Sequence, residues 1–239
     1  MPMKKVFIDI GAHFGESILK ALQPCYGFDV VVAYEPSSLG ARRVRRISEP
    51  RLEVRQMALG NKESIVTLFG AGHLGGSLYG DKQGLLRRDD TEIVTLRRAS
   101  TELGPFLDEG NEVFLKINCE GGEIEILQDL AFKNQLTKFS SVYVDWDSRK
   151  VPSLQIAMLE TQELLVNYNN VFHAHDFEET GWLGVEHWLD KTILKSSTPT
   201  YRLPEHNFLR QPWRSIAFLK KRAPRVFRLL VRVRNRIRL

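Results

Sequence analysis

The strongest fold signal of the chain is the stretch Val6-Phe7-Ile8-Asp9-Ile10-Gly11-Ala12-His13-Phe14-Gly15-Glu16-Ser17. Its apolar first part predicts a buried strand over residues 4–10, and Gly11 predicts a sharp turn after it. We expect a helix from about Ser17 to Leu22. A second apolar run over residues 29–35 stops at Pro36, so the pattern is strand, turn, helix, strand.

The rest of the chain continues this alternation. Strands are expected over residues 52–57, 64–69, 92–96, 113–118, 141–145, 171–174 and 215–219, of which 64–69 follows a turn at 60–62 and is typical of one arm of a hairpin. Helices are expected from Ser37 or Ser38 to about Ile47, over 123–130 and over 154–168. The sequence therefore predicts an α/β fold, with a mostly parallel sheet covered by helices on both faces.

The composition is that of a globular protein. The chain has 239 residues, 43% hydrophobic and 26% charged, and no apolar run approaches the ~20 residues needed to cross a bilayer. Its two cysteines, Cys25 and Cys119, have no Cys or His at metal-site spacing and favour a reducing compartment. We therefore expect one domain over residues 1–219 and a cytoplasmic location.

The end of the chain is strongly basic. Nine of its 34 Lys and Arg lie in residues 220–239, which leaves 25 against 29 acids in the rest. The spacing of these bases fits a helix face in part and a strand in part. Such a tail suits an anionic membrane surface or a partner protein, so the protein could be peripheral to a membrane. Nucleic acid is a poorer fit, because Phe227 is the only aromatic residue there.

The turn after the first strand suits a nucleoside cofactor. Ligands of open α/β sheets bind where the strands end, and Glu35 ends the second strand, where its carboxylate could accept both ribose hydroxyls. A dinucleotide site would read G-x-G-x-x-G, whereas Gly11 and Gly15 read G-x-x-x-G. Asp9 before the turn suits the cationic amino-acid end of S-adenosylmethionine (SAM). An NAD-dependent oxidoreductase is therefore the weaker alternative.

Four segments resemble the FkbM family of methyltransferases and occur in the same order: Val6–Ser17, Ala33–Pro36, Met57–Gly60 and Leu115–Glu123. The most specific is the Lys-Ile-x-x-Glu-Gly-x-Glu block from Lys116 to Glu123. The resemblance implies a Rossmann-like class I SAM-dependent methyltransferase fold with a seven-stranded sheet. It also implies O-methylation of a sugar, a glycolipid or a related natural product.

By the same resemblance, we expect SAM to be held by Asp9, Gly11, Ala12, Gly15, Ser17, Glu35, Pro36, Met57 and Ala58. The family usually has Asp where this chain has Asn118. Asn118 can orient a group by hydrogen bonds but cannot accept a proton at neutral pH. This departure keeps open a second function, a non-catalytic SAM-fold module in a biosynthetic complex.

Methyl transfer to a hydroxyl requires alignment and removal of a proton. Glu120 is the first candidate for a role near the reacting group, and its alternative is a helix-start acid, the role expected of Glu123. His175, in a cluster with His173 and Asp176, is a candidate base because the pKa of His lies near neutrality.

Two further features have open interpretations. Asn118, Asp145 and Asp147 could hold Mg²⁺, although turn residues share this composition, and we otherwise expect no metal. The glycine-rich loop over residues 70–90 could close over substrate or be disordered.

Overall fold

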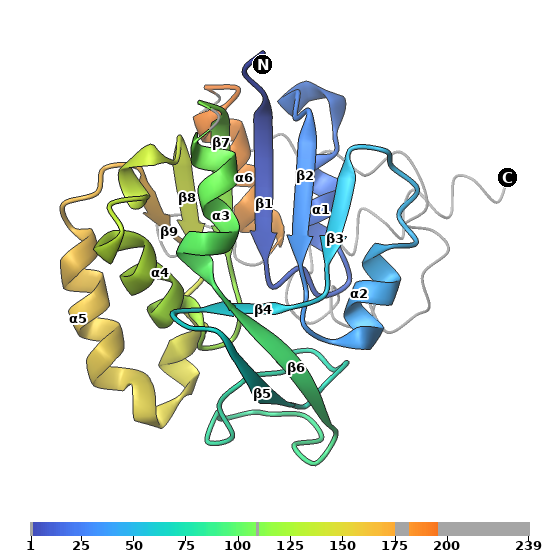
Figure 1. Cartoon of the computed structure of the whole chain (residues 1–239), viewed down its shortest axis with the longest axis vertical. Coiled ribbons are helices and arrows are strands. Elements are labelled where there is room, and N and C mark those ends of the chain that lie inside the picture. The colour runs from blue at the N-terminus through green and yellow to red at the C-terminus, as the bar shows by residue number, and fades with distance from the viewer. Residues whose placement is uncertain (1, 109, 175–181, 196–239) are drawn as a thin grey trace, which may run out of the picture. The chain divides into compact units, whose positions relative to one another are not determined.

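The computed structural model describes residues 2–108, 110–174 and 182–195 (Figure 1). The described residues all belong to one compact unit. His175, Asp176, the strand predicted over 215–219 and the basic tail lie outside them. The division into a domain of residues 1–219 and a tail of residues 220–239 stays a prediction.

A six-stranded parallel sheet forms the centre of this unit, in the order β3-β2-β1-β7-β8-β9. Its strands are β1 (Lys5–Ile10), β2 (Val30–Tyr34), β3 (Leu52–Arg55), β7 (Glu112–Ile117), β8 (Ser141–Val144) and β9 (Val171–His173). All six run in one direction in Figure 1, so their carboxyl ends lie along one edge, which we call the carboxyl edge. The predicted parallel sheet is confirmed. A seventh strand of this sheet is not found among the described residues.

Helices cover both faces of the sheet, as expected. They are α1 (Glu16–Ala21), α2 (Ser38–Val44), α3 (Ala99–Asp108), α4 (Glu123–Phe132), α5 (Gln155–Leu165) and α6 (Trp182–Thr192). One apolar core joins the sheet to α3, α4 and α5, with Leu103, Ile126 and Leu165 inside it. A second core joins the other face to α1, α2 and α6, with Ile18, Val44 and Trp188 inside it.

A smaller three-stranded sheet extends below the carboxyl edge in Figure 1. Its strands are β4 (Ala58–Gly60), β5 (Ser64–Phe69) and β6 (Thr91–Arg98), in the order β4-β6-β5. β5 is antiparallel to β6, so the predicted arm pairs across the loop of residues 70–90 and not across the turn at residues 60–62. The loop over residues 70–90 connects the two.

The sequence missed several boundaries. The strand expected over residues 52–57 ends at Arg55, and Met57 lies between β3 and β4. Helices α3 and α6 were not predicted, and α3 contains Pro105. Short 3₁₀ turns at η1 (Pro24–Tyr26), η2 (Leu136–Lys138), η3 (Asp147–Lys150) and η4 (Pro152–Leu154) complete the fold. Within the described part of the chain, no helix is long and apolar enough to cross a membrane.

Candidate functional site

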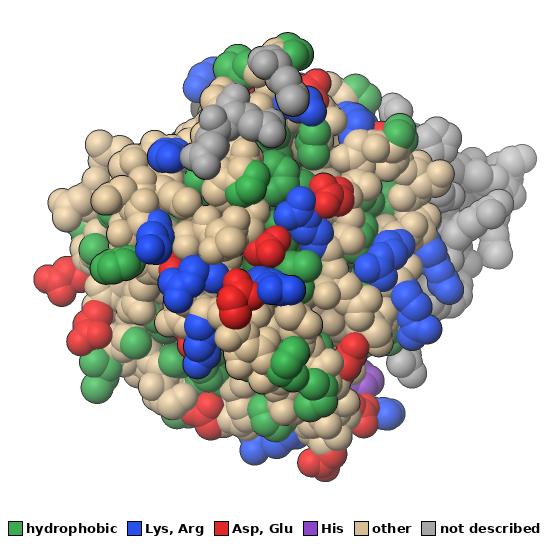
Figure 2. Space-filling view, in the orientation of Figure 1, with side chains coloured by type: hydrophobic (Ala, Val, Ile, Leu, Met, Phe, Trp, Pro, Cys, Tyr) green, Lys and Arg blue, Asp and Glu red, His purple; other side chains and the backbone are tan. Residues whose placement is uncertain are grey.

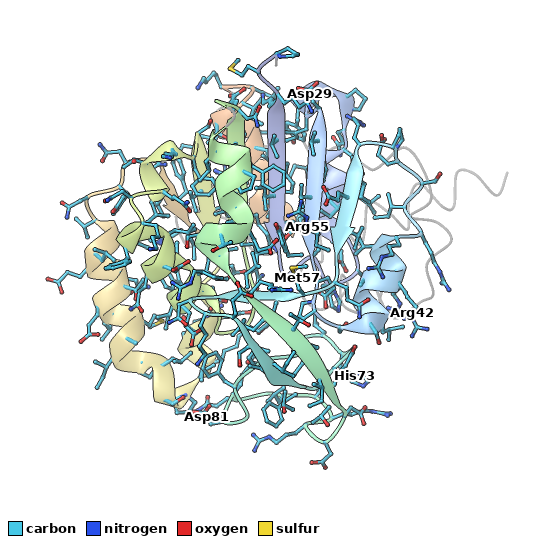
Figure 3. The ribbon with its side chains drawn as sticks, viewed as in Figure 1. Asp29, Arg42, Arg55, Met57, His73 and Asp81 are labelled. Carbon is cyan, nitrogen blue, oxygen red and sulfur yellow. The ribbon has the colours of Figure 1, made fainter. Side chains whose placement is uncertain are left out.

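The strand order places the candidate site at the carboxyl ends of β1 and β7. Successive strands move outward from β1 on one side and from β7 on the other. Such a reversal opens a crevice at the carboxyl edge, where ligands of open α/β sheets bind. Figure 3 shows Met57 at this edge, below Arg55 in the view. Ala58 begins β4 there and is buried.

The turn after β1 is tightly built. Gly11 has a φ of +83°, and a Cβ at this position would lie 1.9 Å from the Asn118 carbonyl oxygen. The backbone N–H groups of Gly11 and Ala12 both donate to the Tyr34 carbonyl, at 3.0 and 3.2 Å. The ends of β1, β2 and β7 therefore meet at Gly11, and no other residue type fits.

Asp9 lies beneath this turn and is fully buried. Its carboxylate accepts a hydrogen bond from the Ser17 hydroxyl at 2.5 Å and pairs with the Lys116 ammonium at 2.7 Å. Lys116 also donates to the Gly11 carbonyl at 2.9 Å. Asp9 thus holds the turn and the start of α1 in place. The prediction that Asp9 itself contacts SAM stays a prediction.

Glu35 follows β2 on the other side of the turn. One carboxylate oxygen accepts the Ser37 N–H at 2.9 Å and the other accepts the His13 N–H at 2.8 Å. Burial raises the pKa of Glu35, against the effect of these two hydrogen bonds. A Cβ on Gly40 would lie 2.7 Å from the Glu35 side chain, so α2 packs directly on it. Glu35 is therefore a fixed acceptor beside the turn.

The remaining members of the predicted cofactor set are close in the chain to these residues. Gly15 has a φ of +90° and is the N-cap of α1, where a Cβ would lie 2.7 Å from Ile47. Pro36 is half-buried between Glu35 and Ser37. Ser37 caps α2 by accepting the Gly40 N–H at 3.0 Å. Of the two serines that the sequence offered as the N-cap, it is therefore Ser37 and not Ser38.

A second group of charged residues lies after β7 and β8. Glu120 pairs with Lys82 at 2.8 Å and lies 3.8 Å from Lys150. Asp147, at the start of η3, lies 2.5 Å from Lys150 and 3.5 Å from Arg149. We call Glu120, Asp147, Lys82, Lys150 and Arg149 the charge cluster.

The two acids of the charge cluster differ in pKa. Burial and the neighbouring Asp147 raise the pKa of Glu120, although Lys150 and Lys82 oppose this. Burial also acts on Asp147, but hydrogen bonds with Glu120 and Lys150 lower its pKa. The pKa of Glu120 is therefore raised from its ordinary value, whereas that of Asp147 is lowered.

The glycine-rich loop reaches the charge cluster. Lys82 is buried and also donates to the Gly75 carbonyl at 2.6 Å. The Ser77 hydroxyl donates to the Glu120 carbonyl at 2.6 Å. Glu120 has a φ of +60°, an uncommon conformation for a residue with a side chain. The middle of the loop is therefore packed on the turn after β7, whereas closure over substrate stays a prediction.

Glu123 contacts the same turn from the start of α4. Its carboxylate accepts the Cys119 N–H at 3.3 Å and the Gly121 N–H at 2.9 Å. Burial raises the pKa of Glu123 to about 8, against these hydrogen bonds. These contacts agree with the helix-start role expected from the sequence.

Each of the proposed magnesium ligands already has a partner within the protein. The Asn118 amide donates to Asp145 at 3.2 Å, whereas Asp147 pairs with Lys150 and Arg149. Among the described residues, no group of three or more His, Cys, Asp or Glu could hold a metal ion. His173, at the end of β9, accepts a hydrogen bond from the Trp146 indole at 2.7 Å.

Sequence reasoning missed Lys82 and Lys150. Lys150 follows Asp147 by three residues, a spacing at which opposite charges pair within a helical turn, so it could have been found. Lys82 has no such signal, because it reaches Glu120 from a distant loop.

A glycine turn followed by an acidic strand end is typical of nucleotide-binding proteins with an open α/β sheet. The Methyltransferase FkbM domain matches residues 9–182. The chain belongs to the FkbM methyltransferase family, as the sequence predicted. No curated protein matches the sequence significantly.

One similar solved structure is the methyltransferase FkbM from Methylobacillus flagellatus KT, with 16% sequence identity and a TM-score of 0.44. The match covers 70% of this chain and 38% of that chain. The chain thus spans well under half the length of that relative.

Proposed function

We propose that this protein is a SAM-dependent O-methyltransferase that modifies a hydroxyl of a sugar, a glycolipid or a related natural product. The FkbM domain over residues 9–182 supports methyl transfer. The observation that carries the proposal further is Glu35. Its two oxygens are oriented by the N–H groups of His13 and Ser37 at the carboxyl edge, beside the turn at Gly11.

The residues at the turn fit the two ends of SAM in different ways. Glu35 suits the ribose, since a carboxylate oxygen that accepts one N–H retains a lone pair for a hydroxyl. Asp9 is fully buried and already bound to Lys116 and Ser17. We therefore expect the amino-acid end of SAM to contact the backbone after Gly11. Asp9 would then act indirectly, by holding that backbone in its conformation.

The chain itself must remove a proton from the acceptor. SAM, when bound, supplies a methyl group made reactive by the sulfonium. Glu120 is the proposed proton acceptor, because its raised pKa strengthens it as a base while Lys82 and Lys150 stabilise its ionised form. Asn118 is proposed to orient the acceptor hydroxyl. His175 stays an alternative base and lies outside the described residues.

Asn118 also supports the alternative of a non-catalytic module. It occupies the position at which the resemblance leads us to expect Asp, and its amide is bound to Asp145. A module of this kind binds SAM without turnover, so binding and turnover must be measured separately.

The first experiment tests the cofactor. Titration calorimetry with SAM, S-adenosylhomocysteine and NAD should show binding of the first two alone. Glu35→Gln should weaken SAM binding about 10- to 100-fold, as expected when a charged hydrogen-bond acceptor is lost. Glu63→Gln is the matched control, because Glu63 is exposed and also accepts a backbone N–H. Binding of NAD alone, or unchanged SAM binding in Glu35→Gln, contradicts the proposal.

The second experiment separates catalysis from binding. Radiolabelled methyl transfer is measured over a panel of sugar and glycolipid acceptors. Glu120→Gln should retain SAM binding and lose about 10²- to 10⁴-fold in turnover, the usual contribution of a general base. Unchanged turnover excludes Glu120 as the base and directs the search to His175. SAM binding without turnover of any acceptor supports the non-catalytic module.

A further inference from the structure

We propose that the exposed face of α2 docks on an anionic membrane surface, with the carboxyl edge close to the lipid. Four exposed arginines form this surface, which we call the arginine face: Arg42 and Arg43 in α2, and Arg45 and Arg46 in the turn that follows it. The opposite face of the helix, formed by Gly40, Ala41 and Val44, is buried against the domain. The fold therefore presents all four positive charges to solvent on one side.

No carboxylate pairs with the arginine face among the described residues. Arg42 donates to the Ser38 carbonyl, Arg45 to the Gln56 amide oxygen, and Arg43 lies 3.7 Å from the centre of the Phe14 ring. Most other arginines of the fold have an acidic partner, as Arg51 has in Glu49 and Arg97 has in Glu63. The four charges of the arginine face are thus not paired with acids among the described residues.

The space-filling view agrees with this distribution. Lys and Arg side chains gather over α2 at the right of Figure 2, with little red between them. Near the centre of the same view, blue and red side chains lie next to one another. An uncompensated basic patch of this kind attracts polyanionic surfaces.

The arginine face lies beside the candidate site. Helix α2 begins at Ser38 and is capped by Ser37, two residues after Glu35, and Glu35 packs against Gly40. The glycine-rich loop is next to it, because a Cβ on Gly72 would lie 3.0 Å from Leu39. Docking through α2 would bring the carboxyl edge and its crevice towards the lipid.

Two leucines of the loop favour lipid over nucleic acid. Leu74 and Leu86 are 51% and 56% exposed and belong to the loop that approaches Leu39 of α2, and exposed apolar side chains together with a basic surface are typical of interfacial binding. Single-stranded nucleic acid needs free aromatic rings for stacking. Phe14, which adjoins α2, is not free, because His13 stacks on it at 3.6 Å and Arg43 lies over it.

The experiment is vesicle flotation with the full chain, using equimolar phosphatidylglycerol and phosphatidylcholine against phosphatidylcholine alone. Wild type should bind the anionic vesicles and be released by salt. Changing all four arginines of the arginine face to Gln should lower binding at least about 10-fold, since each near-surface base contributes about fivefold before screening. The matched control changes Lys4, Lys133, Lys138 and Lys191 to Gln and should lower binding by less than about threefold.

Two further measurements distinguish this surface from the tail and lipid from other polyanions. Removal of residues 221–239 should leave binding that still depends on the four arginines. Single-stranded RNA and inorganic phosphate, measured by the same variants, should show no comparable arginine dependence. Equal vesicle binding by wild type and the α2 variant, or arginine-dependent binding of RNA without vesicle binding, overturns the proposal. SAM titration of every variant verifies that the fold is retained.

Discussion

Two lysines of the site region are almost equally buried, yet their surroundings differ. The side chains of Lys116 and Lys82 are 6% and 3% exposed, and each pairs with a carboxylate, at 2.7 and 2.8 Å. The partner of Lys116 is Asp9, which is fully buried, whereas the partner of Lys82 is Glu120, which is 18% exposed. The first pair is sealed beneath the turn, and the second is open to solvent and to a second cation, Lys150.

This difference gives the two ion pairs different roles, one structural and one in proton transfer. The Lys116–Asp9 pair fixes backbone that a cofactor would touch, so its contribution is to stability and shape. The Lys82–Glu120 pair leaves a partly exposed carboxylate with a raised pKa beside the crevice. Acids with a raised pKa in such positions are candidates for proton transfer.

The largest effect is expected from Gly11→Ala, which tests the turn above the sealed pair. The added Cβ would lie 1.9 Å from the Asn118 carbonyl oxygen, and the φ of +83° is itself unfavourable. We expect a loss of about 4–5 kcal/mol in the free energy of unfolding, measured by urea denaturation. Gly27→Ala is the control, because φ is +65° there and nothing lies within 4 Å of the new Cβ. Equal losses in the two variants would show that close packing at Gly11 is unimportant.

Lys116→Met is expected to cost about 3 kcal/mol, because it leaves the buried Asp9 carboxylate without its cation. Adding Asp9→Asn to this variant should recover part of the loss, since the uncompensated charge is then removed. Lys133→Met, at an exposed lysine, should be nearly neutral. A double variant no more stable than Lys116→Met would contradict the sealed-pair interpretation.

Glu123→Gln tests burial without a cation in the same region. The pKa of Glu123 is raised from 4.5 to about 8, so the folded protein retains a proton that the unfolded chain releases in this range. The contribution of Glu123 to stability is therefore complete below pH 4.5 and is lost as pH rises through about 8.

The Gln variant should remove most of this slope across the window. The measurement is urea denaturation at several pH values. Glu63→Gln should leave the slope in this window unchanged. A wild type whose stability does not fall between these pH values would contradict the raised pKa.

The turn could be predicted from the sequence because its determinants are local. Gly11 and Gly15 indicate left-handed backbone, and Glu35 can be recognised because it stands at the end of an apolar run. The parallel sheet followed from the alternation of strands and helices. The exact end of β3 could not be predicted, because Met57 continues the apolar pattern although the backbone has already left the sheet.

The charge cluster could be predicted only in part. The Lys116–Glu123 block identified Glu120, but nothing near Glu120 in the chain indicates that Lys82 pairs with it. That contact depends on how the 70–90 loop folds back from β5. Such tertiary packing of a loop leaves no periodic pattern in the sequence. Helix α3 was missed for a similar reason, since Pro105 lowers its helix propensity and burial of Leu103 outweighs this.

The smallest effect on stability is expected from Lys82→Met, which tests the open pair. Glu120 retains Lys150 and some contact with water, so the loss should be about 1 kcal/mol, well below that of Lys116→Met. Hydrogen exchange of the 75–82 backbone should nevertheless increase, because Lys82 also holds the Gly75 carbonyl. SAM binding should be retained, whereas turnover of an acceptor should fall and its acidic limb should move to higher pH, since Glu120 loses a cation that stabilises its ionised form. A stability loss equal to that of Lys116→Met, with an unchanged pH profile, would make Lys82 a second structural lysine and remove the distinction between the two pairs.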